Sequence, residues 1–230
     1  MITYTMTKDE VLAELASETV WLDSMRPGIA VKYRKQLNPK TAKEGYSLLG
    51  ITTYATPRKN KVTCAWVRVK TGKYVTIESM HYYEYTTKRG TIQYINPSFG
   101  GVSPVPKKIT IYSGHALQRL RERAGMTLND MLAYQCTTDG FSTHFQGQYE
   151  YLGEMHTMFN LGDKGMFITD EHEWGIIAKT FVNYELLGEA QAAQIKTCLE
   201  KTKQYFGEKM RSISDMASEY PRFMRRSVLV

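Results

Sequence analysis

Four side chains suited to acid–base and phosphate chemistry recur at helical spacing within residues 107–125, KKITIYSGHALQRLRERAG. They stand at positions i, i+4, i+7 and i+8, so a helix places them on one face. The four are His115, Arg119, Glu122 and Arg123. A histidine and a carboxylate can move protons, and guanidinium groups suit a phosphate. The spacing therefore predicts a site for acid–base chemistry at a phosphate.

The elements that must position this face are a short strand and a capped helix. Ile109 and Ile111 alternate with polar residues, which is typical of a half-buried strand. Ser113 is a good N-cap, and Gly125 suits the left-handed residue that ends many helices. The face expected to pack on the core consists of Ala116, Leu117, Leu120 and Ala124.

An ordinary surface helix explains the same pattern. Arg119 and Glu122 can form an ion pair in water, and a solvated charged face opposite a core face is common. His115 favours the catalytic interpretation, because a helix N-terminus disfavours the imidazolium and leaves the ring able to accept a proton. Both interpretations stay open at this point.

Composition predicts a soluble, cytoplasmic protein with a polyanionic partner. The chain has 230 residues, a formal net charge of +7 and 42% hydrophobic residues, so it can bury a real core. Its three cysteines lie far apart without a CxxC pair, which fits a reducing compartment. No apolar run is long enough to cross a bilayer, so no membrane partner is expected. RNA or another polyanion suits the positive charge.

The first part of the chain, residues 1–106, reads as a helix followed by an antiparallel meander. Thr7 and Glu10 have capping-box spacing at the helix start. The expected strands, rich in Val, Ile, Thr and Tyr, are Tyr46–Thr56, Val62–Val69, Lys73–Thr86 and Thr91–Asn96. The glycine- and proline-rich segment Pro97–Pro106 predicts an extended loop and a subdomain boundary.

The second part, residues 107–230, continues from the central helix into another antiparallel set. Thr127 and Asp130 mark a further helix start. The expected strands are Gln148–Leu152, His156–Leu161, Met166–Thr169 and Trp174–Val182, and Glu185–Phe206 has the apolar stripe of an amphipathic helix. Strict alternation along the last strand puts Lys179 and Thr180 on opposite faces. The predicted fold class is α+β, with antiparallel sheets flanked by helices in two parts or in one compact domain.

A second surface combines basic turns with tyrosine-rich strands. Cations beside aromatic rings suit single-stranded nucleic acid, whose bases stack while its phosphates need positive charge. The candidate nucleic-acid-binding residues are Arg58, Lys59, Lys88, Arg89, Tyr83 and Tyr85. Strand propensity alone also explains the tyrosines, so this assignment has an ordinary alternative.

Other kinds of site have little support. The five histidines form no HxxxH or HExxH pattern, and no cysteine pair stands near them, so no metal site is predicted. The acidic segment Asp170–Glu173 is expected to be a solvated turn. Glycines at 162 and 165 lack the Lys-Ser/Thr of a phosphate loop, and no cofactor is predicted.

The segments SGHALQRLRERAG and GMFITDEHEWGIIAKTFV, within residues 108–183, resemble small toxin-type ribonucleases of the RelE and BrnT kind. In those families a His- and Arg-rich helix precedes a compact antiparallel sheet whose late strands complete the site. The resemblance implies metal-independent RNA cleavage by the neighbouring 2′-hydroxyl. It implies an acid–base role for His115 and phosphate contacts from Arg119 and Arg123. Glu122 would be a second acid–base group or orient an arginine, and Thr180 or Lys179 would contribute from the strand.

The sequence therefore predicts a nucleic-acid-binding, toxin-like protein, with metal-independent RNA cleavage at the His115 face as its leading activity. The alternative from another class is a non-enzymatic module or inhibitor, encoded by a phage or mobile element, that binds a protein partner through the same basic face. A structural protein that assembles through its sheet edges is a third interpretation.

Overall fold

The computed structural model describes residues 1–99, 106–137, 146–151, 154–172 and 175–189, and single positions between 192 and 204. These residues form an α+β fold in which helices pack on both faces of one sheet. The helices are α1 (Lys8–Ser24), α2 (Arg26–Lys32), α3 (Gly114–Ala124) and α4 (Leu128–Gln135). The strands are β1 (Gly45–Ala55), β2 (Lys61–Thr71), β3 (Tyr74–Thr86), β4 (Ile92–Phe99), β5 (Pro106–Tyr112), β6 (Gln146–Tyr151), β7 (Glu154–Asn160), β8 (Met166–His172) and β9 (Gly175–Val182).

Two antiparallel meanders merge into that sheet. In the described residues its nine strands follow the order β1-β2-β3-β4-β5-β9-β8-β7-β6. Within each meander consecutive strands pair antiparallel, as predicted, and β5 pairs parallel with β9 through Ile111 and Ile177. This parallel junction unites the two parts of the chain that composition separates near residue 106.

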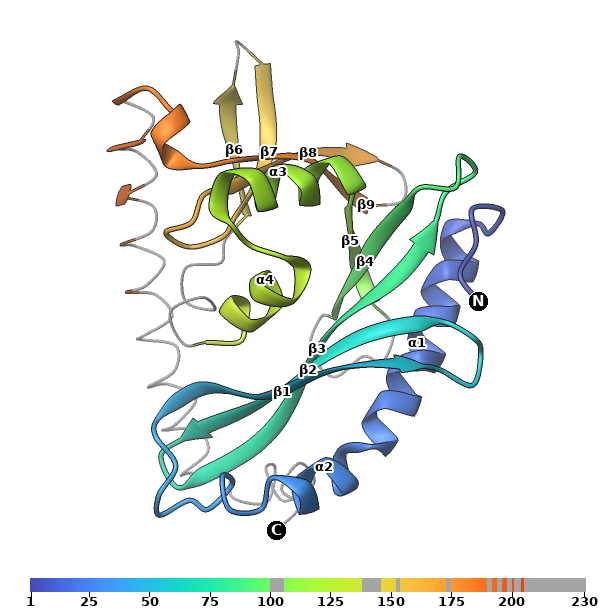
Figure 1. Ribbon diagram of the computed structural model, residues 1–230, viewed down its shortest axis with the longest axis vertical. Helices are drawn as coiled ribbons and strands as arrows, with labels where there is room; N and C mark the ends of the chain where they lie inside the picture. Colours follow the sequence, from blue (N-terminus) through green and yellow to red (C-terminus); the bar gives the residue numbers. More distant parts are fainter. Residues whose placement is uncertain are drawn as a thin grey trace.

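Each face of the sheet has its own core, and different helices cover the two faces (Figure 1). On one face, α3 and α4 pack over a cluster that includes Tyr82, Tyr112 and Phe167. On the other face, α1 packs over a cluster that includes Trp66 and Tyr83. Because β-strand side chains alternate, the neighbours Tyr82 and Tyr83 enter different cores.

The helix starts predicted from capping residues are confirmed. Thr7 and Thr127 each form a complete capping box with the acid three residues later. Ser113 caps α3 by accepting a hydrogen bond from the N–H of Ala116 at 3.1 Å. Gly125 ends α3 with φ 64°, the left-handed conformation that glycine adopts without penalty.

The predicted loop Pro97–Pro106 is wrong at its beginning, because β4 continues to Phe99. Pro97 pairs with Ile109 of β5, while the β3–β4 ladder ends at Tyr83 and Ile95. Pro97, which has no N–H, therefore lies beyond the end of the β3–β4 ladder and interrupts none of its hydrogen bonds. The side chain of Asn96 extends the contact instead, since its Nδ2 donates to the carbonyl oxygen of His81 at 3.0 Å.

Strict alternation along β9 is also wrong, because a bulge interrupts it. Ile168 pairs with Thr180 and Thr169 pairs with Ala178, which leaves Lys179 as the extra residue. Beyond the bulge, Phe181 lies in the same core as Ala178 although three positions separate them. The bulge thus changes which β9 side chains face α3.

Two other predicted segments are described only in part. The acidic segment expected as a turn is partly strand, because β8 continues through His172. The predicted helix Glu185–Phe206 lies mostly outside the described residues. At its start the chain forms a 3-10 turn, Tyr184–Leu186, and the N–H of Ala192 donates to the carbonyl of Gly188 at 3.0 Å.

We expect Gly175→Ala to destabilise the fold by about 3 kcal/mol, measured from the midpoint of urea unfolding. Gly175 has φ 132° at the start of β9, and an added Cβ would collide with the carbonyl oxygen of Ile109 in β5. The matched control is Gly28→Ala in α2, where an added Cβ meets no atom within 4 Å. That control should be neutral or stabilising. Equal midpoints for the two variants would contradict the close approach of β5 and β9.

Candidate functional site

The central helix α3 is fixed to the sheet at its N-terminal end. Ala116 and Leu120 are fully buried in the core shared with β9, as their spacing predicts. The N–H of Ser113 donates to the carbonyl of Ala178 at 3.2 Å, and its hydroxyl donates to the carbonyl of Lys179 at 3.3 Å. The polar face of α3 is therefore presented on a rigid base.

Arg119 and Glu122 form an ion pair on this exposed face. Arg119 Nη1 lies 2.6 Å from Glu122 Oε2, and Gln118 Nε2 donates to Glu122 Oε1 at 2.8 Å. The hydrogen bond from Gln118 and the one from Arg119 lower the pKa of the Glu122 carboxyl. Glu122 is therefore a carboxylate at neutral pH and is poorly suited to donate a proton. His115 is exposed in the first turn of the same helix.

Arg123 contributes to the contact with the sheet. Its Nη1 donates to the carbonyl oxygen of Phe181 in β9 at 2.5 Å, and the side chain is half-buried. This bond fixes the C-terminal turn of α3 to β9. Part of the guanidinium is thus already engaged, whereas Arg121 on α3 is exposed.

The structure does not bring Thr180 to the face that carries α3. Thr180 pairs with Ile168 and shares its side of the sheet with Met166 and Val182, which form a separate apolar cluster. Phe181, not Thr180, faces α3. Lys179 forms an ion pair with Asp170 of β8. Three of the five predicted catalytic residues therefore lie on the outer side of α3: His115, Arg119 and Glu122.

Some residues of the predicted nucleic-acid-binding surface are buried in the structure. Tyr83 is 0% exposed inside the α1-side core, so it cannot stack on a base. Tyr85 is partly buried against the same core. Arg58 pairs with Glu14, Nη1 to Oε2, at 2.7 Å, which offsets its charge. The exposed members of the set are Lys59, Lys88 and Arg89, with Arg58 about half exposed.

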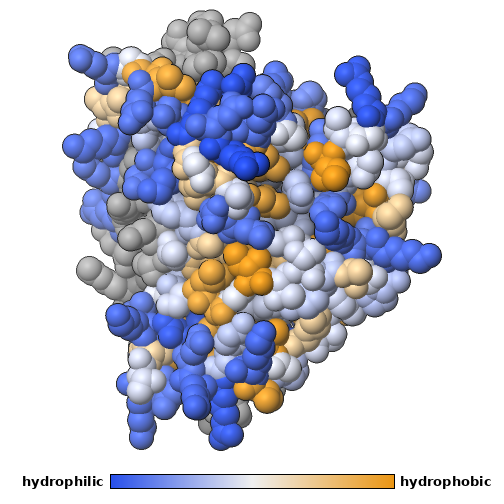
Figure 2. Space-filling model, viewed as in Figure 1, coloured by the Kyte–Doolittle hydropathy of each residue, from blue (hydrophilic) through white to orange (hydrophobic). Residues whose placement is uncertain are grey.

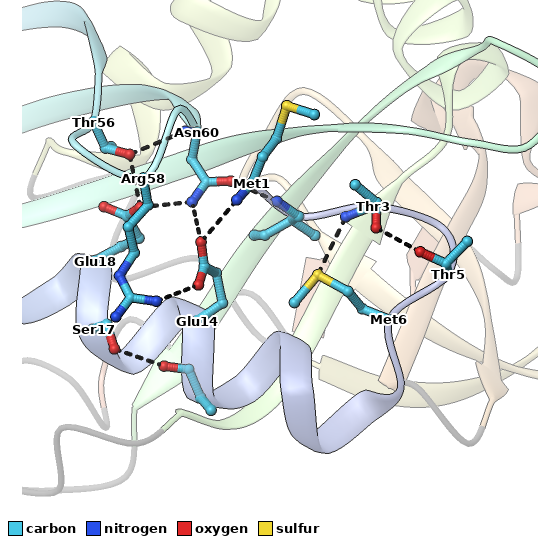
Figure 3. A network of polar contacts seen from close by, with 12 residues as sticks. Met1, Thr3, Thr5, Met6, Glu14, Ser17, Glu18, Thr56, Arg58 and Asn60 are labelled. Atoms are coloured by element: carbon cyan, nitrogen blue, oxygen red, sulfur yellow. Dashed lines mark hydrogen bonds and ion pairs between the residues drawn. The ribbon is translucent and has the colours of Figure 1, made fainter.

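A buried polar network that sequence reasoning missed joins α1 to the β1–β2 turn (Figure 3). Asn60 Nδ2 donates to Glu14 Oε1 at 2.8 Å and to Glu18 Oε1 at 2.6 Å. Thr56 Oγ1 also donates to Glu18 Oε1, at 2.7 Å. Asn60 Oδ1 accepts from the N–H of Ile2 at 2.7 Å. One asparagine thus links two buried carboxylates and the N-terminal segment.

The signal for this network was the position of Glu18 on its helix. Val11, Leu15, Glu18 and Leu22 follow each other at core spacing, and all four are buried. An acid on an apolar stripe indicates a buried partner, since an isolated carboxylate is too costly to bury. The amine of Met1, 3.1 Å from Glu14 Oε1, and the Arg58 guanidinium supply positive charge next to Glu14.

Metal and thiol chemistry find no support within the described part of the chain. No three His, Cys, Asp or Glu side chains gather there in a way that could hold a metal ion. Burial raises the pKa of the Cys64 and Cys136 thiols to about 12, so thiolate nucleophiles are scarce at neutral pH. Among the described helices, none is both long and apolar enough to span a membrane.

Comparisons of the chain with protein-family models, with curated proteins and with solved structures find no match. The candidate functional surface is therefore defined by the chain's own residues. It is the outer side of α3, with His115, Arg119, Arg121 and Glu122, supported from below by the Arg123 bond to β9.

Proposed function

We propose that the protein binds nucleic acid through the outer side of α3. The single observation that carries this proposal is the charge of that helix. Three arginines occupy two turns of α3, and Glu122 is the one acid among the residues of the helix. Guanidinium groups form bidentate hydrogen bonds with phosphate oxygens, and a positively charged protein surface attracts polyanions.

The fixed position of α3 supports this function. Its inner side is buried in the core, and hydrogen bonds join both of its ends to β9. The backbone of α3 is therefore already ordered, and binding would lose little conformational entropy there. Figure 2 shows strongly hydrophilic side chains gathered over α3 on the viewed face of the molecule. The Arg119–Glu122 pair is exposed, and a phosphate can compete for the Arg119 fork.

The double variant Arg119→Ala with Arg121→Ala should bind a fluorescent oligonucleotide about tenfold more weakly than wild type. Each lost phosphate contact also lowers the slope of log Kd against log salt by about 0.7 to 0.9, which anisotropy titrations at several salt concentrations measure. The matched control is Arg34→Ala with Lys35→Ala, two exposed cations that follow α2. Equal losses in both double variants would mean that net charge, not α3, determines binding.

RNA cleavage centred on His115 is a second candidate function, supported by the exposed imidazole in the first turn of α3. Cleavage by a 2′-hydroxyl needs a proton acceptor and a proton donor. Glu122 is ionised, so it can accept a proton but not supply one, and Thr180 is on the other side of the sheet. The reaction would therefore use Glu122 as the proton acceptor and His115 as the proton donor, with arginine on the phosphate. Wild type and His115→Ala should be compared on RNA in EDTA. Cleavage lost in the variant, with binding retained, supports catalysis; no cleavage by wild type leaves the binding function alone.

A further inference from the structure

Two turns that are far apart in the sequence lie side by side at one end of the sheet. The N-terminal segment adds a parallel bridge between Thr3 and Thr86, the last residue of β3. Thr86 also pairs with Ile92 at the start of β4, so the three residues form one row across the sheet. The turn after Thr3 and the β3–β4 turn therefore project together, at the upper right of Figure 1.

The N-terminal turn presents an aromatic ring at this end. The N–H of Met6 donates to the carbonyl of Thr3 at 3.2 Å, which closes the turn and leaves Tyr4 near its tip. Tyr4 is 49% exposed, and within the described part of the chain its ring has no hydrogen bond or ring contact. Ile92, 48% exposed, adds apolar surface on the far side of Thr86 from Thr3.

The β3–β4 turn, beside the N-terminal turn, presents two cations. Lys88 and Arg89 are both exposed, and neither forms an ion pair with another described residue. The turn is closed by bonds from the N–H of Gly90 to the carbonyl of Thr87, and from the N–H of Thr87 to the carbonyl of Thr91, each 2.9 Å. The cations are therefore held on a preformed tip.

This end of the sheet is continuous with α3. A Cβ placed on Gly114, the first residue of α3, would lie 3.4 Å from the carbonyl oxygen of Ile92. The first turn of α3, which carries His115, therefore starts beside Ile92, at the base of the β3–β4 turn. Figure 2 shows protruding hydrophilic side chains at the β3–β4 turn on the same viewed face as those over α3.

We propose that Tyr4 stacks on a base while Lys88 and Arg89 hold the neighbouring phosphates, so that the protein prefers single-stranded nucleic acid. This inference rests on the proposed nucleic-acid binding at α3 and extends that surface to a second contact. Single strands expose base faces to aromatic rings, whereas a duplex keeps its bases stacked on each other. The aromatic contact expected from the strand tyrosines would thus come from a turn.

The test uses anisotropy titrations of the full chain with a labelled single-stranded oligonucleotide and its duplex. Tyr4→Ala should weaken single-strand binding about tenfold and leave the salt slope unchanged, because stacking releases no counterions. Tyr4→Phe, which keeps the ring, should bind within about twofold of wild type. Lys88→Ala with Arg89→Ala should lower the salt slope by about 1.4, as expected for two lost phosphate contacts on a single strand.

The matched control is Lys73→Ala with Tyr74→Ala at the β2–β3 turn. There Lys73 Nζ lies 5.5 Å from the centroid of the Tyr74 ring, so the same residue types meet at the opposite end of the strands. This control should bind like wild type. Equal affinity of wild type for single strand and duplex, or wild-type affinity of Tyr4→Ala, overturns this inference. The proposed binding at α3 is tested separately by Arg119→Ala with Arg121→Ala. Loss of all salt-sensitive binding in wild type overturns both.

Discussion

Replacing Asn60 by Asp should lower the free energy of unfolding by about 4 kcal/mol, the largest effect expected of any single substitution considered for this protein. The Asn60 side chain is 1% exposed and donates its two amide hydrogens to the carboxylates of Glu14 and Glu18. Aspartate has no such hydrogens, so three carboxylates would meet in a buried site. The midpoint of urea unfolding at pH 7 measures the loss.

A second substitution separates the charge effect from a general packing defect. Glu18→Gln added to Asn60→Asp removes one carboxylate and supplies amide donors, so at least half of the lost stability should return. The deficit of Asn60→Asp should also shrink as the pH falls toward 4 and carboxylates take up protons. Lys59→Ala, at the exposed neighbouring position, should change stability by less than about 0.5 kcal/mol. An Asn60→Asp protein as stable as wild type would show that the network does not hold α1 on the sheet.

Stability should fall as the pH is lowered from about 6.5 to about 4, and His81 should account for about 3 kcal/mol of that fall. Complete burial under α1 and α2 lowers the pKa of the His81 imidazole to about 4. The nearby charges act in opposite directions, since Asp23 raises the pKa and Arg26 lowers it. Because the folded pKa lies below the unfolded value, the unfolded chain takes up the proton first. The stabilisation is present above pH 6.5 and lost toward pH 4.

The difference between wild type and His81→Phe isolates this titration from all others. Phenylalanine keeps a ring beside Tyr83, whose centroid lies 5.3 Å from that of His81. Urea unfolding of both proteins should be followed from pH 7.5 to pH 4. The stability of wild type relative to the variant should decline by about 3 kcal/mol over this range. Parallel curves would mean that His81 titrates alike in the folded and unfolded chains.

Much of the fold could be predicted because its signals are local. Thr7, Ser113 and Thr127 cap helices through bonds to residues within three positions, and Gly125 ends α3 by its own backbone preference. The strand alternation was equally local and predicted antiparallel hairpins. The parallel pairing of β5 with β9 could not be predicted, since it depends on which distant strand covers the free edge of β5.

The candidate site was predictable only along α3. Helical spacing placed His115, Arg119 and Glu122 together, as the structure has them. It could not show that Arg123 reaches the carbonyl of Phe181, or that the bulge at Lys179 leaves Thr180 facing away. The Arg123 bond and the β9 bulge depend on contacts between different helices and strands, and residue spacing within one element does not predict such contacts.

The tyrosines show the same limit. Alternation alone cannot tell which face of a sheet is covered, and α1 covers the face that Tyr83 occupies. Tyr4 gave no signal in the sequence, because a single tyrosine near a chain end has many ordinary explanations. The bridge between Thr3 and Thr86 brings its turn beside the β3–β4 turn, which carries Lys88.

The parallel junction between β5 and β9 also orders events during synthesis on the ribosome. The strands β1 to β5 can pair as hairpins with their neighbours while they emerge, since each contact is close in the chain. The core beneath α3 must wait, because it needs Phe167 and Phe181 from strands translated much later. Until β9 is made, Leu120 and Tyr112 lack the part of their core that Phe167 and Phe181 supply. A chain that ends before β9 should therefore expose the apolar surface of this core and aggregate.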